Sequence, residues 1–135
     1  MRFLLDTNTV SALMRSDPAA SRRLLAARPD DVAIAQPVLA ELRYGLARLG
    51  NSRRRRELEQ RLTILLGALE HALWTDEVSQ QFGEVKAKLE KRGERVDDFD
   101  VAIAAHALAY DAIVVTDNAR HFGRIPGIAV ETWTG

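Results

Sequence analysis

Three aspartates, Asp97, Asp98 and Asp100, stand at the start of an otherwise apolar helix that the sequence predicts over residues 96–109. Helix starts favour anions because the first N–H groups lack hydrogen-bond partners, so one of the three would be an ordinary N-cap. Asp97 and Asp100 resemble an acidic capping box, and Asp97 and Asp98 keep this purely structural interpretation beside a chemical one. Asp100 leads a face of small residues, where a carboxylate is partly desolvated and stays ionised only beside a hydrogen-bond or charge partner. Asp100 is therefore the candidate for chemistry in this segment.

Two further aspartates follow short apolar runs. Asp6 comes directly after Phe3–Leu5, and Asp117 follows Ala112–Val115 and one threonine. An unbroken apolar run of this length is typical of a strand that is buried on both faces of a parallel sheet. Ligands of open α/β sheets bind at the carboxyl ends of the strands. We therefore expect Asp6 and Asp117 at one functional edge of a sheet.

Glu41 is the fourth acidic candidate. It lies in a helix predicted to begin at Gln36, and its neighbours three and four residues away are Val38 and Gly45, so it borders the apolar stripe of that helix. Two interpretations stay open at this point. Either the carboxylate extends into solvent from the edge of the stripe, or it is an inward group directed at Asp6.

The elements that would position these groups alternate between strands and helices. Strands are predicted at residues 3–5, 32–35, 71–74, 112–115 and 128–130. Helices are predicted at residues 10–14, from 17, from 36, from 51 to about 70, from 75 to about 93, and at 97–109. This alternation predicts a three-layer α/β/α fold with a mostly parallel sheet of about five strands and right-handed crossovers. The four acidic segments then face one pocket.

Length and composition limit the class of protein. A chain of 135 residues favours one domain over residues 1–135, with no second domain needed. The net charge of zero excludes a global basic field, so any contact with nucleic acid must come from local patches such as Arg53–Arg56, for which a solvated helix face is the alternative. The lack of cysteine excludes disulfides and thiolate metal sites. With no apolar run long enough to span a membrane, we expect a cytoplasmic protein without membrane contact.

Carboxylates gathered in one pocket repel one another, so either some stay protonated or a hard divalent cation occupies the centre. An all-oxygen set suits Mg²⁺ or Mn²⁺, and Mg²⁺ keeps several waters and accepts phosphate oxygens. One such ion can activate water for in-line attack on a phosphodiester, and a second can stabilise the leaving oxygen. The pattern therefore predicts metal-dependent phosphodiester hydrolysis.

The predicted roles divide between carboxylates and their polar neighbours. The catalytic and metal-binding set is Asp6, Glu41, Asp100 and Asp117. Asp6 and Asp100 would be principal ligands, with Glu41 as an outer ligand or a water-orienting base. The residues that would complete or orient the set by hydrogen bonds are Asn8, Thr116 and Asn118.

Four short motifs carry a resemblance to a known family: Leu4-Leu5-Asp6-Thr7-Asn8, Glu41-Leu42-Arg43-Tyr44-Gly45, Asp100-Val101-Ala102-Ile103-Ala104-Ala105-His106-Ala107, and Val115-Thr116-Asp117-Asn118. In this order and at these separations they resemble the PIN-domain ribonucleases, and most of all the VapC toxins of VapBC toxin–antitoxin pairs. The resemblance covers essentially the whole chain. Carried over by position, it implies that Asp6, Glu41, Asp100 and the Asp117-Asn118 corner form the acidic set. Close relatives often have two amides at that corner, so Asp117 is either a ligand or a neighbour of Asn118.

The resemblance also implies an activity and partners. It implies a PIN-like fold and an endoribonuclease toxin, dependent on Mg²⁺ or Mn²⁺, that cuts structured RNA, often a tRNA. It further implies inhibition by a small VapB-like antitoxin, and a homodimer within a higher toxin–antitoxin complex. We expect the antitoxin to lay an apolar helix across the helices of residues 37–70 and to send a basic side chain into the acidic pocket.

Other functions fit the pattern less well. A receiver-like phosphotransfer domain needs a lysine near the phosphoryl group, and no lysine lies at a predicted strand end. A dehalogenase-type phosphatase needs a second aspartate two residues after the first, where this chain has Asn8. A catalytically silent PIN-fold module that only binds RNA or protein is opposed by the four filled acidic positions.

The histidines and tryptophans receive structural interpretations. His71, His106 and His121 are far apart in sequence and form no metal-binding pair, so none is assigned a metal role. Trp74 and Trp133 are interpreted as core or interface residues rather than as platforms for RNA bases.

Overall fold

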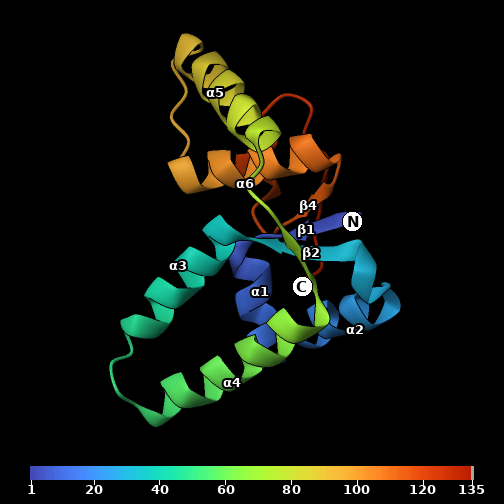
Figure 1. The fold of residues 1–135 in the computed structure, drawn as a ribbon, viewed down its shortest axis with the longest axis vertical. Coiled ribbons are helices and arrows are strands. Elements are labelled where there is room, and N and C mark those ends of the chain that lie inside the picture. The colour runs from blue at the N-terminus through green and yellow to red at the C-terminus, as the bar shows by residue number, and fades with distance from the viewer. Residues whose placement is uncertain (135) are drawn as a thin grey trace.

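A computed structural model describes residues 1–134, in which five parallel strands lie between two layers of helices (Figure 1). In chain order the elements are β1 (Phe3–Leu5), α1 (Thr7–Met14), α2 (Pro18–Ala26), the short 3-10 helix η1 (Pro29–Asp31), β2 (Val32–Ala35), α3 (Gln36–Ala47), α4 (Arg53–Ala68), β3 (Glu70–Ala72), α5 (Asp76–Lys91), α6 (Asp98–Tyr110), β4 (Ile113–Val115), α7 (Ala119–Phe122) and β5 (Val130–Glu131). Helices α5 and α6 cover one face of the sheet, and α1, α2 and α4 lie on the other side (Figure 1). The predicted α/β/α fold class is confirmed.

The strand order is β3-β2-β1-β4-β5, and every pair is parallel. Leu4 of the central strand β1 pairs with Ala33 of β2 on one side and Val114 of β4 on the other. Because all five strands run in the same direction, their carboxyl ends form one edge of the sheet. The segments that follow β1 and β4 therefore emerge close together.

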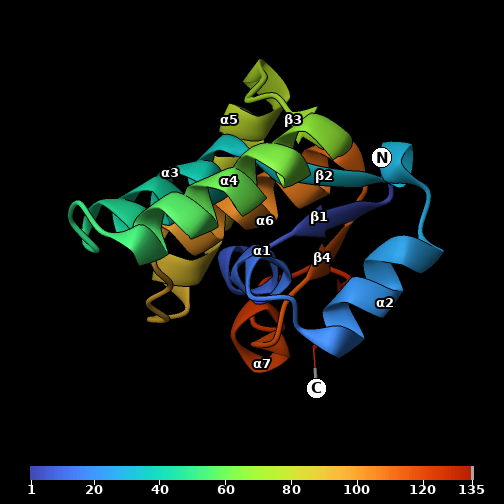
Figure 2. The ribbon, with the colours of Figure 1, turned by 90° about the horizontal axis from the view of Figure 1, so that it is seen from below.

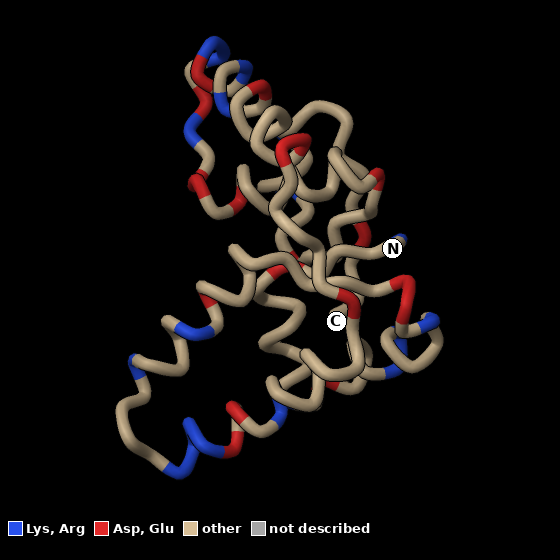
Figure 3. The backbone as a smooth tube through the Cα atoms, in the orientation of Figure 1, with Lys and Arg blue, Asp and Glu red and all other residues tan. Residues whose placement is uncertain are grey.

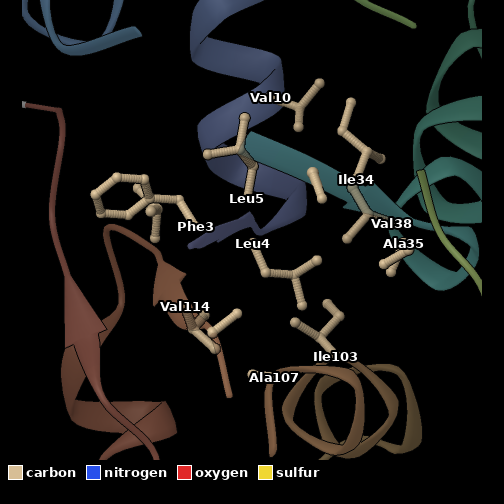
Figure 4. Packing of buried hydrophobic residues seen from close by; sticks show 14 of the residues in the cluster. Phe3, Leu4, Leu5, Val10, Ile34, Ala35, Val38, Ile103, Ala107 and Val114 are labelled. Atoms are coloured by element: carbon tan, nitrogen blue, oxygen red, sulfur yellow. The ribbon is translucent and has the colours of Figure 1, made fainter. Parts of the chain in front are cut away.

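Apolar contacts on both faces of β1 hold this arrangement. Leu4 and Leu5 are fully buried, Val10 of α1 packs on one side, and Ile103 and Ala107 of α6 pack on the other (Figure 4). Each fully buried aliphatic side chain of this size contributes about 1.5–3 kcal/mol. The alanines of α6 let its backbone lie close to the sheet, which fixes the position of the helix start.

Three predicted boundaries are wrong by a few residues, each for a local reason. Helix α1 begins at Thr7 rather than residue 10, because the Asp6 carboxylate caps it by accepting a hydrogen bond from the Thr9 N–H at 2.8 Å. Strand β3 ends at Ala72, before Trp74, whose indole N–H donates to the Ser79 hydroxyl at 2.7 Å. Strand β5 lies at residues 130–131 rather than 128–130, paired with β4.

Helix α4 carries the arginine run at its first turn. Arg53 and Arg55 form ion pairs with Glu57 and Glu59 one turn later, each at 3.1 Å. Exposed pairs of this kind contribute about 0.3–0.5 kcal/mol each and are typical of a solvated helix face. Within residues 1–134, no helix combines the length and the apolar character that crossing a membrane requires.

His106 is a fully buried histidine inside α6. Its Nδ1 lies 2.7 Å from the Ala102 carbonyl oxygen, its Nε2 has no hydrogen-bond partner among the described residues, and the Trp74 ring contacts it edge-on with centroids 5.2 Å apart. Burial lowers the pKa of His106 below its ordinary value of 6.5, and the contact with Ala102 opposes this shift. The buried ring therefore favours the neutral form and serves the core.

We predict that His106→Leu makes unfolding less sensitive to acid. The unfolded chain takes up a proton on His106 before the native protein does, so this group lowers wild-type stability as the pH falls below 6.5. Leucine removes the unpartnered nitrogen at the loss of one hydrogen bond, so stability near pH 7.5 should change by about 0 to +2 kcal/mol. Urea unfolding at neutral and acidic pH measures both effects. His71→Leu, at an exposed histidine, is the control, and an unchanged pH slope in the His106 variant would contradict the prediction.

Candidate active site

A cavity of about 320 Å³ opens at the carboxyl edge of the sheet. Four segments that are far apart in the chain line it: the β1–α1 turn, the second turn of α3, the start of α6 and the segment after β4. The lining residues are Asp6, Thr7, Asn8, Glu41, Asp97, Asp100, Ile103, Asn118, His121 and Phe122. Two arms of the molecule, one formed by α3 and α4 and the other by α5 and α6, carry acidic positions of α3 and of the start of α6 on the sides where the arms meet (Figure 3). Of the four predicted carboxylates, Asp6, Glu41 and Asp100 line this cavity.

Asp6 stands directly after β1 and is 4% exposed. Its own N–H donates to the Val115 carbonyl oxygen at 3.0 Å, which ties it to the end of β4, and its carboxylate accepts from the Thr9 N–H at 2.8 Å. Burial raises the pKa of Asp6, contacts with Thr116 and Thr9 lower it, and the charge of Asp117 raises it further. The backbone thus fixes a carboxylate whose charged form is destabilised.

Of the two interpretations left open for Glu41, the structure supports the inward one, because Glu41 lines the cavity. The Thr7 hydroxyl donates to its Oε1 at 2.7 Å, which joins α3 to the β1–α1 turn. Burial raises the pKa of Glu41, the hydrogen bond from Thr7 lowers it, and the charges of Asp100, Asp97 and Asp6 raise it. Thr7 was not among the predicted site residues, although its place between Asp6 and Asn8 is the signal that could have identified it.

Asp100 lies in the first turn of α6 and contacts His121 of α7. Asp97 is the N-cap, as predicted, because its carboxylate accepts a hydrogen bond from the Phe99 N–H at 2.8 Å. The carboxylate of Asp100, the other member of the proposed capping box, contacts His121 instead, with Asp100 Oδ2 and His121 Nε2 2.9 Å apart. Burial raises the pKa of Asp100, His121 lowers it, and Asp97 raises it. Sequence reasoning left His121 out of the site, and only its position one helical turn after Asn118 hints at this contact.

Asp117 and Asn118, which follow β4, were the residues expected to complete the site. Asn118 lines the cavity, whereas Asp117 is exposed outside the lining set and accepts a hydrogen bond from the Asn8 amide at 3.3 Å. Thr116 is buried, and its hydroxyl oxygen accepts from the Asn118 N–H at 2.9 Å. Figure 2 shows α7 following β4 on the side of α1. The geometry favours Asn118 as the inner group, with Asp117 at the rim.

The donor set suits a hydrated divalent cation. Asp6, Glu41 and Asp100 all have raised pKa values, and no lysine or arginine is among the residues that line the cavity. Within residues 1–134, no three histidine, aspartate or glutamate side chains lie close enough together to coordinate one metal ion directly. The carboxylates instead surround a space that admits an ion with part of its water shell, which Mg²⁺ retains in most protein sites. The residues therefore fit Mg²⁺ or Mn²⁺.

This fold and this acidic edge define a class of protein. The family model described as PIN domain matches residues 3–128, and the chain belongs to the PIN-domain family. Within that family its relatives are VapC ribonucleases. It is 33% identical over 135 residues to ribonuclease VapC2 of Rickettsia felis, with 98% of each chain covered. It is 31% identical over 136 residues to the tRNA(fMet)-specific endonuclease VapC of Salmonella typhimurium, again with 98% of each covered.

Comparison with solved structures agrees with this family assignment. The structure of VapBC2 from Rickettsia felis, bound to a DNA fragment from its promoter, matches with a TM-score of 0.88 and 32% identity, covering 98% of this chain and 99% of that one. DNA-bound VapBC from Salmonella typhimurium matches with a TM-score of 0.82 and 32% identity, covering 98% of both chains. The predicted resemblance to VapC is confirmed, while the roles of individual residues stay predictions.

We predict that Asp6→Asn stabilises the metal-free protein. Because the pKa of Asp6 is raised, its charged form destabilises the native state at neutral pH, and this effect disappears as the pH falls through the raised pKa. Asparagine caps a helix as well as aspartate does, so the free energy of unfolding near pH 7 should rise by about 0.5–2 kcal/mol. Chemical unfolding followed by circular dichroism measures the difference.

The matched control is Asp17→Asn, the same substitution at the N-cap of α2, where the carboxylate accepts from the Ala20 N–H at 2.9 Å. It should change stability by only a few tenths of a kcal/mol. Excess Mg²⁺ should reduce the advantage of Asp6→Asn, because a ligand stabilises only a protein that binds it. If Asp6→Asn is no more stable than Asp17→Asn, the buried charge of Asp6 does not destabilise the native protein.

Proposed function

We propose that this chain is a metal-dependent endoribonuclease, the toxin of a VapBC-type module, which hydrolyses phosphodiester bonds in structured RNA, with tRNA as the substrate class. The observation that carries the proposal is the convergence of Asp6, Glu41 and Asp100 on one cavity, where each has a raised pKa. The ribonuclease names of its relatives support the reaction, and the tRNA(fMet) specificity in the name of the Salmonella relative supports the substrate class.

The chain's own residues supply positioning and proton transfer. Asp6, Glu41 and Asp100 would hold Mg²⁺ or Mn²⁺, which when bound lowers the pKa of water and neutralises charge on the phosphate. Thr7 fixes one oxygen of Glu41 and leaves the other free, and the raised pKa of this carboxylate suits it to accept a proton from the attacking water. The Asn118 amide, a neutral donor at the cavity wall, can contact a phosphate oxygen without adding to the repulsion.

Basic residues near the ends of both arms support an RNA substrate. Figure 3 shows arginine and lysine positions around the α3–α4 turn and at the end of α5, where acidic positions alternate with them. Arg48 is the C-cap of α3 and Arg54 lies in the first turn of α4, whereas Lys91 and Arg92 end α5. Phosphates on either side of the cleaved bond would contact these residues, and local patches of this kind are needed because the net charge is zero.

We predict that RNA cleavage requires both a divalent ion and Asp100. Purified protein should cleave total RNA in Mg²⁺ or Mn²⁺ and not in EDTA. Asp100→Asn should reduce cleavage by a factor of about 100 or more, because a catalytic metal supplies several kcal/mol and each 1.36 kcal/mol is tenfold in rate. Gel analysis of tRNA and total RNA over time measures it.

The control is Asp111→Asn, at the other end of α6. Asp111 is exposed and adopts a left-handed conformation with φ 53°, which asparagine tolerates. This variant should cleave like the wild type. RNA that is bound but never cut in either metal would instead favour a catalytically silent binding module.

The proposed partners are a VapB-like antitoxin and a second copy of the chain. The VapBC complexes among the similar structures support the antitoxin. An acidic cavity is complementary to one basic side chain, and an apolar helix laid across α3 and α4 would bring such a side chain to it. Exposed apolar groups at Trp74 and Phe99 support a homodimer.

We predict that overproduction of the chain alone arrests growth of a bacterial host. Coexpression of a small partner encoded beside it should restore growth and yield a stable complex, because the partner blocks the cavity. Asp6→Asn should be harmless without the partner, whereas Asp17→Asn should arrest growth like the wild type. Growth curves, copurification and light scattering of the free and bound toxin measure these outcomes. Normal growth at high levels of soluble protein would exclude the toxin function.

A further inference from the structure

Among the residues that line the acidic cavity, His121 is the one nitrogen base. Its Nε2 lies 2.9 Å from Asp100 Oδ2, and the two side chains are similarly shielded, at 28% and 27% exposed. The set of site residues predicted from the sequence did not include His121.

We propose that His121 is a positioning residue for the metal site: its Nε2–H group holds Asp100 Oδ2, so that the carboxylate presents Oδ1 to the divalent ion. The inference rests on the proposed metal-dependent function and adds a residue to it. A ligating carboxylate commonly accepts a hydrogen bond from a neighbouring group that fixes its orientation. Here that neighbour comes from α7, a different element from the carboxylate it holds.

The chemistry of both groups agrees with this role. A carboxylate has acceptor positions on two oxygens, so one hydrogen bond to Oδ2 leaves Oδ1 available. An ionised carboxylate oxygen can only accept, so in this contact Nε2 carries the proton, and a nitrogen that donates its proton cannot at the same time ligate the ion. His121 thus acts on the metal through Asp100.

The β4–α7 segment is built to hold the ring in place. The His121 N–H donates to the Asn118 carbonyl oxygen at 3.1 Å, and the ring meets Phe122 edge-on with centroids 6.3 Å apart. Phe122 is almost fully buried, so it anchors the turn. The Asn118 N–H in turn donates to Thr116. One short segment therefore carries both the inner amide of the site and the donor to Asp100.

The experiment measures Mn²⁺ binding by isothermal titration calorimetry on the full chain, without RNA. His121→Leu removes the donor and should weaken Mn²⁺ binding by about 10–100-fold, the usual effect of losing such a partner of a ligand. His121→Gln, whose side-chain amide can place an N–H group near the position of Nε2, should stay within about threefold of the wild type. Arg120→Ala, an exposed neighbour outside the cavity, is the control and should bind Mn²⁺ normally.

Cleavage assays give a second measure. For His121→Leu, the Mn²⁺ concentration for half-maximal cleavage should rise by about the same factor as the loss in binding, with the rate at saturating Mn²⁺ restored to near the wild-type value. A merely structural defect would instead lower the rate at every metal concentration and would not be rescued by glutamine. Circular dichroism establishes that each variant is folded.

The outcomes separate this inference from the function on which it rests. If the wild type binds Mn²⁺ and His121→Leu binds it equally or more tightly, His121 is a bystander or a competitor of the ion, and the inference is wrong while the nuclease proposal survives. A glutamine variant as weak as leucine would also overturn it. If the wild type binds no divalent ion, both proposals fail.

Discussion

The burial of mutually repelling carboxylates at one edge of a parallel sheet is the constraint on which this structure depends. Burial raises the pKa of Asp6, Glu41 and Asp100, and the charges of Asp6 and Asp100 raise the pKa of Glu41 further. These side chains would move apart if the backbone did not hold them in place. The β1–β4 pairing and the fully buried leucines of β1 fix the ends from which these side chains extend. The hydrophobic core thus stabilises an arrangement that is unfavourable by itself.

Helix starts reduce this repulsion. Asp6 is the N-cap of α1, and Asp100 lies in the first turn of α6. The N-terminal end of a helix carries a partial positive charge, which favours an anion by about 0.3–1 kcal/mol. Asp6 accepts a backbone N–H as well, so one side chain both begins a helix and lines the cavity. Burial still outweighs these contacts, since the pKa of Asp6 is raised rather than lowered.

The remaining charge distribution agrees with a nuclease of the VapC type. The chain has no net charge, yet the residues that line the cavity include four carboxylates and no lysine or arginine, while basic positions occur near the α3–α4 turn and the end of α5 (Figure 3). An acidic cavity by itself repels a phosphate, and a bound cation reverses that local field. On the proposed mechanism, the substrate would therefore enter only when the ion is present, and the arms would hold the strand on either side.

The sequence by itself determined the fold class, the sheet and five of the residues that line the cavity, which are Asp6, Asn8, Glu41, Asp100 and Asn118. Short apolar runs followed by polar residues identified β1 and β4, and the spacing of Asp6, Glu41 and Asp100 indicated convergence, because strand ends and helix starts of a parallel sheet share one edge. It also predicted the Asp97 cap, since capping is a local interaction. Each strand end, helix start and cap depends on residues that are near one another in the chain, and the parallel sheet then brings these ends to one edge.

Only the tertiary structure decided the contacts between remote segments. Thr7 meets Glu41 across 34 residues, and His121 meets Asp100 from a four-residue helix that has no distinctive sequence pattern. The same is true of the segment after β4, where Asn118 lines the cavity and Asp117 instead accepts a hydrogen bond from Asn8. Side-chain direction in a turn depends on backbone angles that tertiary packing imposes, so residue spacing alone could not determine it.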